Sequence, residues 1–388
     1  MHSQGLPYIR GIIQSGLGKF TLLTFEKKEH LKKYGPRYVS KLRQELKEEG
    51  IDWRFLYYHK YPALLAKLFD ITSGSVYSII LIIAKRVKLI HARGITSAVM
   101  ALGPKCILGV KIIFDMRNFL AEAYVSAGIW KPGSLNFKLV KQMEKLVLEN
   151  AFITIVESHP HFRALEKYKY GNIEIIPCCV DLDKFRYNRD GGKPTNDFGL
   201  DNRFYLIYIG SLGTWYMMDE MLDFYENLSK DISFSDCGLI LATRHSPTEI
   251  IERIKAKGLD MEKISILNLD HQEIPGVLSL SRLGMAFIKP YERTDSFPTK
   301  IGEYLASGLP VVLNKGMGDA EVLIKENKVG VIIDSFSEEG YKEAVNKLKL
   351  LLKEGESLNW RCRQVAEKHL SLKKAVDRYC VIYKNSMK

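Results

Sequence analysis

The stretch Asp295–Val312, DSFPTKIGEYLASGLPVV, places a cation and a carboxylate in a predicted helix that runs into a buried strand. Ser296 is a predicted helix cap, Pro298 suits a first turn, and Lys300 adds positive charge where free backbone N–H groups already favour phosphate. Glu303 follows one turn later, and its acceptor-only carboxylate suits the paired hydroxyls of a ribose. The pattern predicts a nucleotide site. The alternative is an ordinary helix and strand of an α/β domain.

Short apolar runs alternate with helical patterns along most of the chain, which predicts parallel, doubly wound sheets. A chain of 388 residues exceeds the usual size of a single core, so two domains are expected. The polar run 190–197, rich in glycine and proline, is the predicted linker. The predicted strands are 20–25, 53–58, 89–92, 111–115, 152–156, 173–176, 204–209, 238–242, 264–267, 284–288, 310–313 and 329–333.

Two of the N-terminal strands end in charged residues, Arg93 after one strand and Asp115 with Arg117 at the other. Ligands of open α/β sheets bind at this carboxyl edge. A guanidinium there suits a phosphate or a developing negative charge, but it cannot act as a base. The alternative is that Asp115 and Arg117 simply pair with each other.

Positive charge is concentrated in the first half of the chain. Residues 1–190 hold 30 Lys and Arg against 17 Asp and Glu, whereas residues 191–388 hold 27 against 28. Within the basic run 27–47, Lys33, Arg37 and Lys41 have helical i,i+4 spacing, so this face is a candidate for an anionic membrane surface. A solvated basic helix face is the alternative, and Gly35-Pro36 is a possible break near the start of this helix. No recognised nucleic-acid-binding motif accompanies the charge, so no nucleic acid partner is expected.

The chain shows no sign of export or of a bound metal. Its longest apolar run, 76–84, is far shorter than the roughly 20 residues that a bilayer requires, and no cleavable signal pattern is present. The six cysteines contain no CxxC pair, so we expect free thiols and no metal site. A cytoplasmic protein is predicted, with a peripheral position at the inner face of the membrane as a further expectation.

Four segments carry a resemblance to a known family. DSFPTKIGEYLASGLPVV resembles the nucleotide-binding signature of family-4 (group 1) retaining glycosyltransferases, in which two acids have seven residues between them. Here the acids are Asp295, where relatives usually carry Glu, and Glu303. The segment GMGDAEVLIKENKVGVIID at 316–334 continues the resemblance, and YIGSLGTWY at 208–216 resembles the first strand and glycine turn of the donor domain. The strand end FDMR at 114–117 is similar to a bacterial, polysaccharide-type subgroup.

The resemblance implies the GT-B fold, an α/β architecture of two Rossmann-like domains facing a central cleft. Residues 1–190 would form the acceptor-side domain, without the first strand that relatives usually have, and residues 191–370 the donor domain. The helix within 371–388 would cross back to the N-terminal domain through a stripe of Leu372, Val376, Tyr379 and Tyr383.

The resemblance and the residues together imply a site. Glu303 would hold the ribose, and the donor sugar would meet Asp295, Gly318 and Asp319. The diphosphate would meet Lys300, Ser296, Thr299, Gly210, Ser211 and Arg244. Asp115, Arg117 and Arg93 would face them from the acceptor side, so that Asp295, Arg117 and Asp115 are the catalytic candidates.

These features predict a retaining, metal-independent glycosyltransferase of polysaccharide biosynthesis. The donor would be a UDP- or GDP-sugar, used without a cofactor, and the acceptor a glycan or a lipid-linked glycan. Two alternatives stay open, namely a sugar-nucleotide epimerase-like enzyme of the same fold and a catalytically degenerate or non-enzymatic binding protein.

Overall fold

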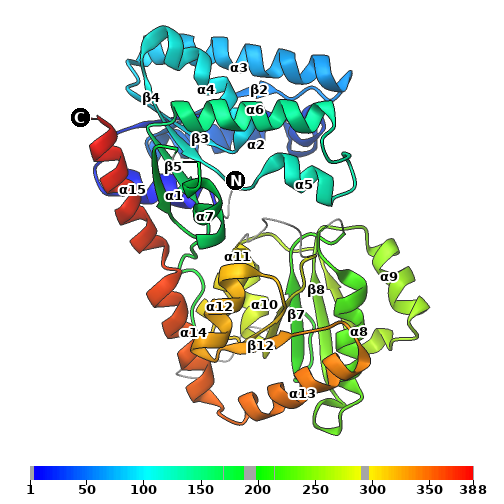
Figure 1. Ribbon diagram of the computed structural model, residues 1–388. Coiled ribbons are helices and arrows are strands. Elements are labelled where there is room, and N and C mark those ends of the chain that lie inside the picture. Colours follow the sequence, from blue (N-terminus) through cyan, green and yellow to red (C-terminus); the bar gives the residue numbers. More distant parts are fainter. Residues whose placement is uncertain (1–3, 169, 188–197, 214, 290–296, 388) are drawn as a thin grey trace.

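The computed structural model describes residues 4–168, 170–187, 198–213, 215–289 and 297–387. Two α/β domains lie one above the other, and the C-terminal helices run along one side from the lower domain to the upper one (Figure 1). All twelve predicted strands are present, each with ends within two residues of the predicted ones. The predicted linker at 190–197 lies outside the described residues.

The N-terminal domain contains two separate parallel sheets. One pairs β1 (Phe20–Glu26) with β2 (Ile51–Tyr57). The other has the order β3-β4-β5-β6, with β3 at Leu89–Arg93, β4 at Lys111–Asp115, β5 at Ile153–Val156 and β6 at Asn172–Ile175. The helices of this domain are α1 (Leu6–Gln14), α2 (Lys28–Glu48), α3 (Ala63–Lys85), α4 (Ile95–Leu108), α5 (Leu120–Ser126), α6 (Leu135–Asn150) and α7 (His159–Glu166).

Helix α2 is not continuous. Gly35 has φ 77° and ψ 160°, far from helical values, and Pro36 follows it. Lys33 therefore precedes the kink, whereas Arg37 and Lys41 follow it. The expectation that these three cations form one i,i+4 face is wrong, because the kink changes the direction of the helix between them.

The C-terminal domain has one six-stranded parallel sheet of order β12-β11-β10-β7-β8-β9. Its strands are β7 (Tyr205–Ile209), β8 (Gly238–Ala242), β9 (Ile264–Leu267), β10 (Leu283–Ala286), β11 (Val311–Asn314) and β12 (Gly330–Ile333). Its helices are α8 (Met218–Ser229), α9 (Pro247–Ala256), α10 (Ile274–Ser279), α11 (Thr299–Ala306), α12 (Gly318–Asn327), α13 (Glu338–Leu352) and α14 (Glu356–His369). The strand order reverses between β7 and β10, and ligands of such sheets bind outside the carboxyl ends at this switch point.

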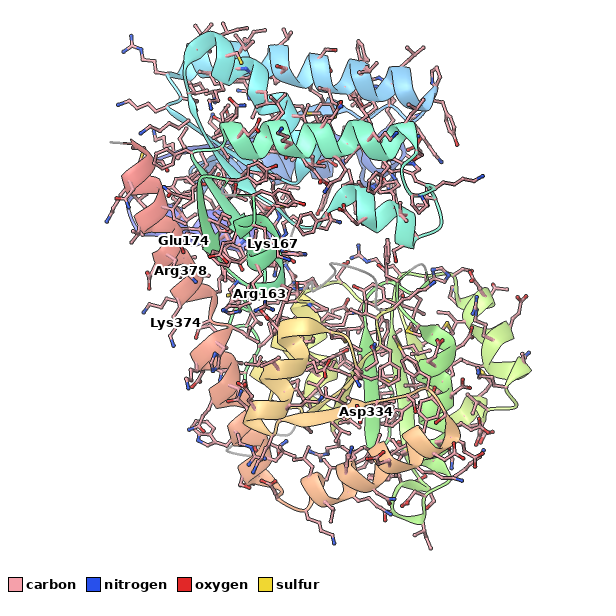
Figure 2. The ribbon with its side chains drawn as sticks, viewed as in Figure 1. Arg163, Lys167, Glu174, Asp334, Lys374 and Arg378 are labelled. Carbon is pink, nitrogen blue, oxygen red and sulfur yellow. The ribbon has the colours of Figure 1, made fainter. Side chains whose placement is uncertain are left out.

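The last helix, α15 (Leu372–Met387), packs against the N-terminal domain as predicted. Val376, Tyr379 and Tyr383 are buried, and the ring centroid of Tyr379 lies 5.5 Å from that of Tyr8 in α1. Figure 2 shows Arg378 of α15 beside Glu174 of β6, to which its guanidinium donates a hydrogen bond of 2.5 Å. These contacts tie the two ends of the chain together in one domain.

Helix α3 is unusually long and apolar. Among the described residues, the helix window Leu65–Lys85 within α3 is long and apolar enough to cross a bilayer by length and composition, and only 22% of the tested window is buried. The expectation that no segment reaches this length was wrong, because the polar residues of α3 are few and scattered. They do not interrupt an otherwise apolar helix.

Candidate functional site

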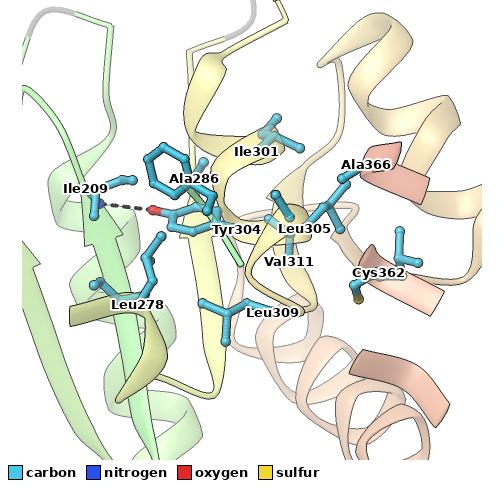
Figure 3. Close-up of a cluster of buried hydrophobic side chains, with 14 of the residues drawn as sticks. Ile209, Leu278, Ala286, Ile301, Tyr304, Leu305, Leu309, Val311, Cys362 and Ala366 are labelled. Atoms are coloured by element: carbon cyan, nitrogen blue, oxygen red, sulfur yellow. Dashed lines mark hydrogen bonds between the residues drawn. The ribbon is translucent and has the colours of Figure 1, made fainter. Parts of the chain in front are cut away.

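Helix α11 is fixed at the switch point by Tyr304. The Tyr304 hydroxyl accepts a hydrogen bond of 3.0 Å from the backbone N–H of Ile209, at the end of β7 (Figure 3). It also donates one of 3.2 Å to the carbonyl of Met285 in β10. Gly284 makes room for this ring, because a Cβ there would lie 2.5 Å from it. One side chain thus joins α11 to both strands that border the switch point.

The start of α11 differs in one respect from the prediction. The residue that precedes the helix is Pro298, which has no side-chain cap bond, and Thr299 is the half-buried first helical residue. The prediction that Ser296 caps the helix is therefore wrong, because the helix begins three residues after it. Asp295 and Ser296 both lie outside the described residues. Their predicted contacts with the sugar and the diphosphate stay predictions.

Lys300 lies buried beneath the glycine turn that follows β7. Its ammonium donates a hydrogen bond of 2.9 Å to the hydroxyl of Tyr208. It lies 4.0 Å from the ring centroid of Tyr208 and 3.8 Å from that of Tyr216, which are cation–π distances. Burial lowers the pKa of Lys300 well below its ordinary value, against the opposing charge of Glu303. This cation is held by dipoles and aromatic faces, an arrangement that an incoming phosphate would stabilise further.

The glycine turn packs against Lys300. Gly210 has φ 121°, which L side chains rarely adopt, and a Cβ there would lie 3.0 Å from the Lys300 ammonium nitrogen. The Tyr208 hydroxyl donates to the carbonyl of Ser211, so the exposed Ser211 backbone is anchored from below. Gly210 thus lies directly beside Lys300, and Ser211 is linked to Lys300 through the Tyr208 hydroxyl.

Glu303 is also buried, one turn after Lys300 on α11. Its carboxylate lies 3.1 Å from His271 Nε2, and His271 Nδ1 lies 2.6 Å from the Lys184 ammonium nitrogen. An ammonium only donates, so Nδ1 accepts and Nε2 carries the proton that is donated to Glu303. Burial lowers the pKa of Lys184, against the charges of Glu303 and Asp181. The chain from Lys184 through His271 therefore orients the carboxylate of Glu303.

Two other predicted residues, Arg244 and Asp319, have partners of their own. Arg244 is exposed and lies 2.6 Å from the carboxylate of Asp270, which makes it a surface ion pair at the same sheet edge. Gly318 begins α12, and the Asp319 carboxylate accepts hydrogen bonds of 2.7 Å and 2.9 Å from the backbone N–H and ring of His159. Because His159 belongs to α7, Asp319 links the two domains.

The charged residues of the N-terminal domain form one cluster. The carboxylate of Asp115 is fully buried and lies 2.6 Å from Arg93 and 3.2 Å from Arg117. Arg117 also pairs with Glu157 and donates to the sulfur of Cys178 at 2.9 Å. Burial raises the pKa of Asp115, but the guanidiniums of Arg117 and Arg93, together with His91, hold it well below its ordinary value.

The charged residues at these strand ends were expected either to face a ligand or to pair with each other. Asp115 and Arg117 pair with each other, as the alternative held, and Asp115 has no exposed surface to offer a substrate. The Arg93 side chain is 36% exposed, so it is the member of the cluster that solvent and ligands reach most readily.

Sequence reasoning missed four residues of this site, namely Lys184, Tyr208, Tyr216 and His271. The two tyrosines flank the glycine turn in the quoted segment 208–216, so their place beside it was available as a signal. Lys184 and His271 lie in loops with no motif around them, and only the fold brings them to Glu303. Within the described ranges, no three His, Cys, Asp or Glu side chains gather as a potential metal site.

The chain is similar in part to a known protein family and in fold to several solved structures. Residues 195–368 match the family model described as glycosyl transferases group 1. No curated protein sequence matches the chain. Among solved structures, a sucrose-phosphate synthase from Thermosynechococcus elongatus has a TM-score of 0.70 at 15% identity, covering 95% of this chain and 98% of that one. A glycosyltransferase from Rickettsia africae has a TM-score of 0.68 at 17% identity, covering 95% and 99%.

A third similar structure is Anabaena HepE in complex with UDP, with a TM-score of 0.69 at 14% identity, covering 95% of this chain and 100% of that one. Likenesses at such low identity establish the fold, which is GT-B. The matched family model covers the sheet, α11 and the residues around Lys300 and Glu303. The protein thus has the GT-B fold, and its residues 195–368 match the family model of glycosyl transferases group 1.

Proposed function

We propose that the protein is a retaining glycosyltransferase that uses a UDP- or GDP-sugar, requires no metal or cofactor, and acts in the cytoplasm on a glycan or lipid-linked acceptor. One observation carries the proposal. A buried cation, Lys300, and a buried carboxylate, Glu303, lie one turn apart on α11 at the switch point of the sheet. This pairing suits a nucleoside diphosphate, which offers phosphate oxygens to the cation and ribose hydroxyls to the carboxylate.

The chemistry follows from these positions. Departure of the nucleoside diphosphate builds negative charge on its phosphates, and a cation already in place stabilises that charge without reorganisation. Lys300 and the first backbone N–H groups of α11 supply the positive potential. Because these groups are fixed to β7 and β10, the enzyme contributes mainly positioning and electrostatics, and no bound metal is needed to neutralise the leaving group.

Calorimetric titration of the purified chain with UDP and with GDP tests the proposal. UDP is the first probe, since HepE was solved with it. We expect one nucleotide to bind, and both Lys300→Ala and Glu303→Ala to weaken that binding about tenfold or more. The matched controls are Lys342→Ala and Glu338→Ala, an exposed i,i+4 pair on α13. Wild-type affinity in either of the first two variants would remove that residue from the site.

Retention and metal independence need separate measurements. Once a donor sugar is found, the anomeric configuration of the product is read by NMR, and retention is expected. Activity is compared with and without a chelator, and no loss is expected. An inverted product or a strict metal requirement would overturn the corresponding part of the proposal, while leaving the nucleotide site intact.

A further inference from the structure

An apolar stripe lies exposed along α3 in the N-terminal domain. Leu65, Phe69, Val76, Ile80 and Ile83 are each more than half exposed. Their spacings of four, seven, four and three residues put them on one face of the helix. Contiguous exposed apolar surface of this kind marks an interaction site in soluble proteins.

The opposite face of α3 is packed into the domain. Asp70 is buried and bonds to the backbone N–H of His59 at 3.0 Å and to its ring at 2.6 Å. A Cβ on Gly74 would lie 2.8 Å from the sulfur of Met100 in α4 and 3.0 Å from the ring of Phe25 in β1. Since one face is fixed to the domain, α3 lies along the surface and presents the other face outward. Figure 1 shows it at the edge of the molecule far from the C-terminal domain.

A groove continues the apolar stripe toward β2. It has a volume of about 410 Å³ and is lined by Leu56 of β2 and, on α3, by Phe69, Val76, Tyr77 and Ile80 among others. Its walls are almost entirely apolar, so it suits hydrocarbon better than a polar ligand.

The charge around α3 points to the chemistry of the partner. Between Trp53 and Val110 the sequence has eight Lys and Arg residues and one acidic residue, the buried Asp70. Three of these cations have acidic partners outside this range, since Arg54 and Lys85 pair with Asp52 and Arg93 pairs with Asp115. Lys60 and Lys67 are exposed near the start of the helix, and Arg86 and Lys88 are exposed just after its end. Tyr57, Tyr58 and Tyr61 are also exposed beside Lys60, in the mixture of aromatic and basic residues that membrane interfaces favour.

We propose that the exposed face of α3 docks on an anionic lipid bilayer, with its apolar stripe buried at the headgroup boundary and its flanking cations on the lipid phosphates. A second copy of the chain is a poorer occupant, because a symmetric contact would bring the exposed flanking cations of the two copies together. The inference is independent of the proposed function, since it concerns a surface that contains none of the candidate site residues.

Vesicle flotation with the full chain tests the inference. Vesicles of phosphatidylcholine alone are compared with vesicles that also contain phosphatidylglycerol. We expect binding to the anionic vesicles that weakens with salt, and a loss of about tenfold or more in Ile80→Glu/Ile83→Glu. The matched control is Ile232→Glu/Leu350→Glu, which adds the same charge at exposed apolar residues of the C-terminal domain and should bind like wild type.

Three outcomes would overturn the inference. In the first, wild type does not float with anionic vesicles, or Ile80→Glu/Ile83→Glu floats equally well. In the second, sedimentation shows a wild-type dimer that the double substitution dissociates while vesicle binding is absent, which assigns the stripe to a second copy. In the third, only detergent and not salt releases the bound chain, which indicates a spanning α3. Nucleotide titration of the same variant, expected to be unchanged, separates these failures from a failure of the proposed function.

Discussion

The hydroxyl of Tyr304 joins α11 to β7, through the hydrogen bond of 3.0 Å from the backbone N–H of Ile209. The preceding residue on α11 is Glu303, and Lys300 lies one turn earlier. The position of both candidate ligand-binding side chains therefore depends on one buried phenol.

Tyr304→Phe should lower the free energy of unfolding by about 2 kcal/mol, because it leaves the buried N–H of Ile209 without its partner. Urea unfolding measures the change. Tyr34→Phe is the control, since the Tyr34 ring is half exposed, and a change near zero is expected there. Equal stability of the two variants would show that the Tyr304 hydroxyl does not fix α11.

His271→Ala should weaken nucleotide binding about tenfold, because Glu303 loses the donor that orients its carboxylate. His271→Gln retains an N–H donor and should recover part of the affinity. Titration calorimetry compares them with His245→Ala, which removes a similar contact of 2.7 Å to Glu249 at the surface. If His271→Ala binds nucleotide as tightly as His245→Ala, the His271 contact does not position Glu303.

Gly210→Ala should weaken nucleotide binding, because its Cβ would lie 3.0 Å from the Lys300 ammonium nitrogen and would displace that cation. Gly213→Ala is a close control. Gly213 also has a positive φ, 80°, but its Cβ would meet no atom within 4 Å. Both variants should lose about 1 kcal/mol of stability or more from backbone strain, and calorimetry should find a binding defect only in Gly210→Ala. A similar defect in both would assign the effect to strain alone.

Asp115→Asn should cost about 3 kcal/mol of stability at neutral pH, since it leaves the guanidinium of Arg117 with less countercharge in a buried cluster. Asp270→Asn, which breaks the exposed pair with Arg244 at 2.6 Å, should cost about 1 kcal/mol or less.

The pH dependence gives a second check on Asp115. Its folded-state pKa is lowered below the ordinary 3.8, so the stabilisation from its charge is present above pH 3.8 and is lost as the pH falls below it. Asp115→Asn should therefore flatten acid unfolding in this range. If Asp115→Asn loses stability with falling pH just as wild type does, the charge of Asp115 is not a source of the acid dependence.

Lys300→Met should raise the free energy of unfolding by about 1 kcal/mol at neutral pH while weakening nucleotide binding, because the buried ammonium is costly until a phosphate reaches it. Burial lowers the folded-state pKa of Lys300 below 10.5, so wild-type stability should rise as the pH approaches 10.5, and the variant should lack this rise. Urea unfolding at neutral pH and near pH 10 measures the free energy of unfolding of both proteins. Lys342→Met, at an exposed lysine, is the control. A variant less stable than this control would contradict the account.

The sequence by itself determined the strands, the order of the elements and the residues at the switch point. Each strand is a short apolar run between polar segments, and burial on both faces of a parallel sheet demands that composition locally. The cap at Ser296 was wrong, because the residue at which a helix starts depends on backbone geometry that spacing does not reveal. The basic face of α2 is interrupted at Gly35, where the pair Gly35-Pro36 is itself a sequence signal for a break.

Only the tertiary structure decided what surrounds each charge. Lys300 contacts Tyr208, which is 92 residues away in the sequence, and Glu303 contacts His271 across 32 residues. His271 lies in a loop without a recognisable pattern. The same holds for α3, whose apolar residues would look like core until the fold leaves one face of the helix uncovered. Periodicity identifies an apolar face, but what covers that face depends on how distant segments pack, which local sequence does not specify.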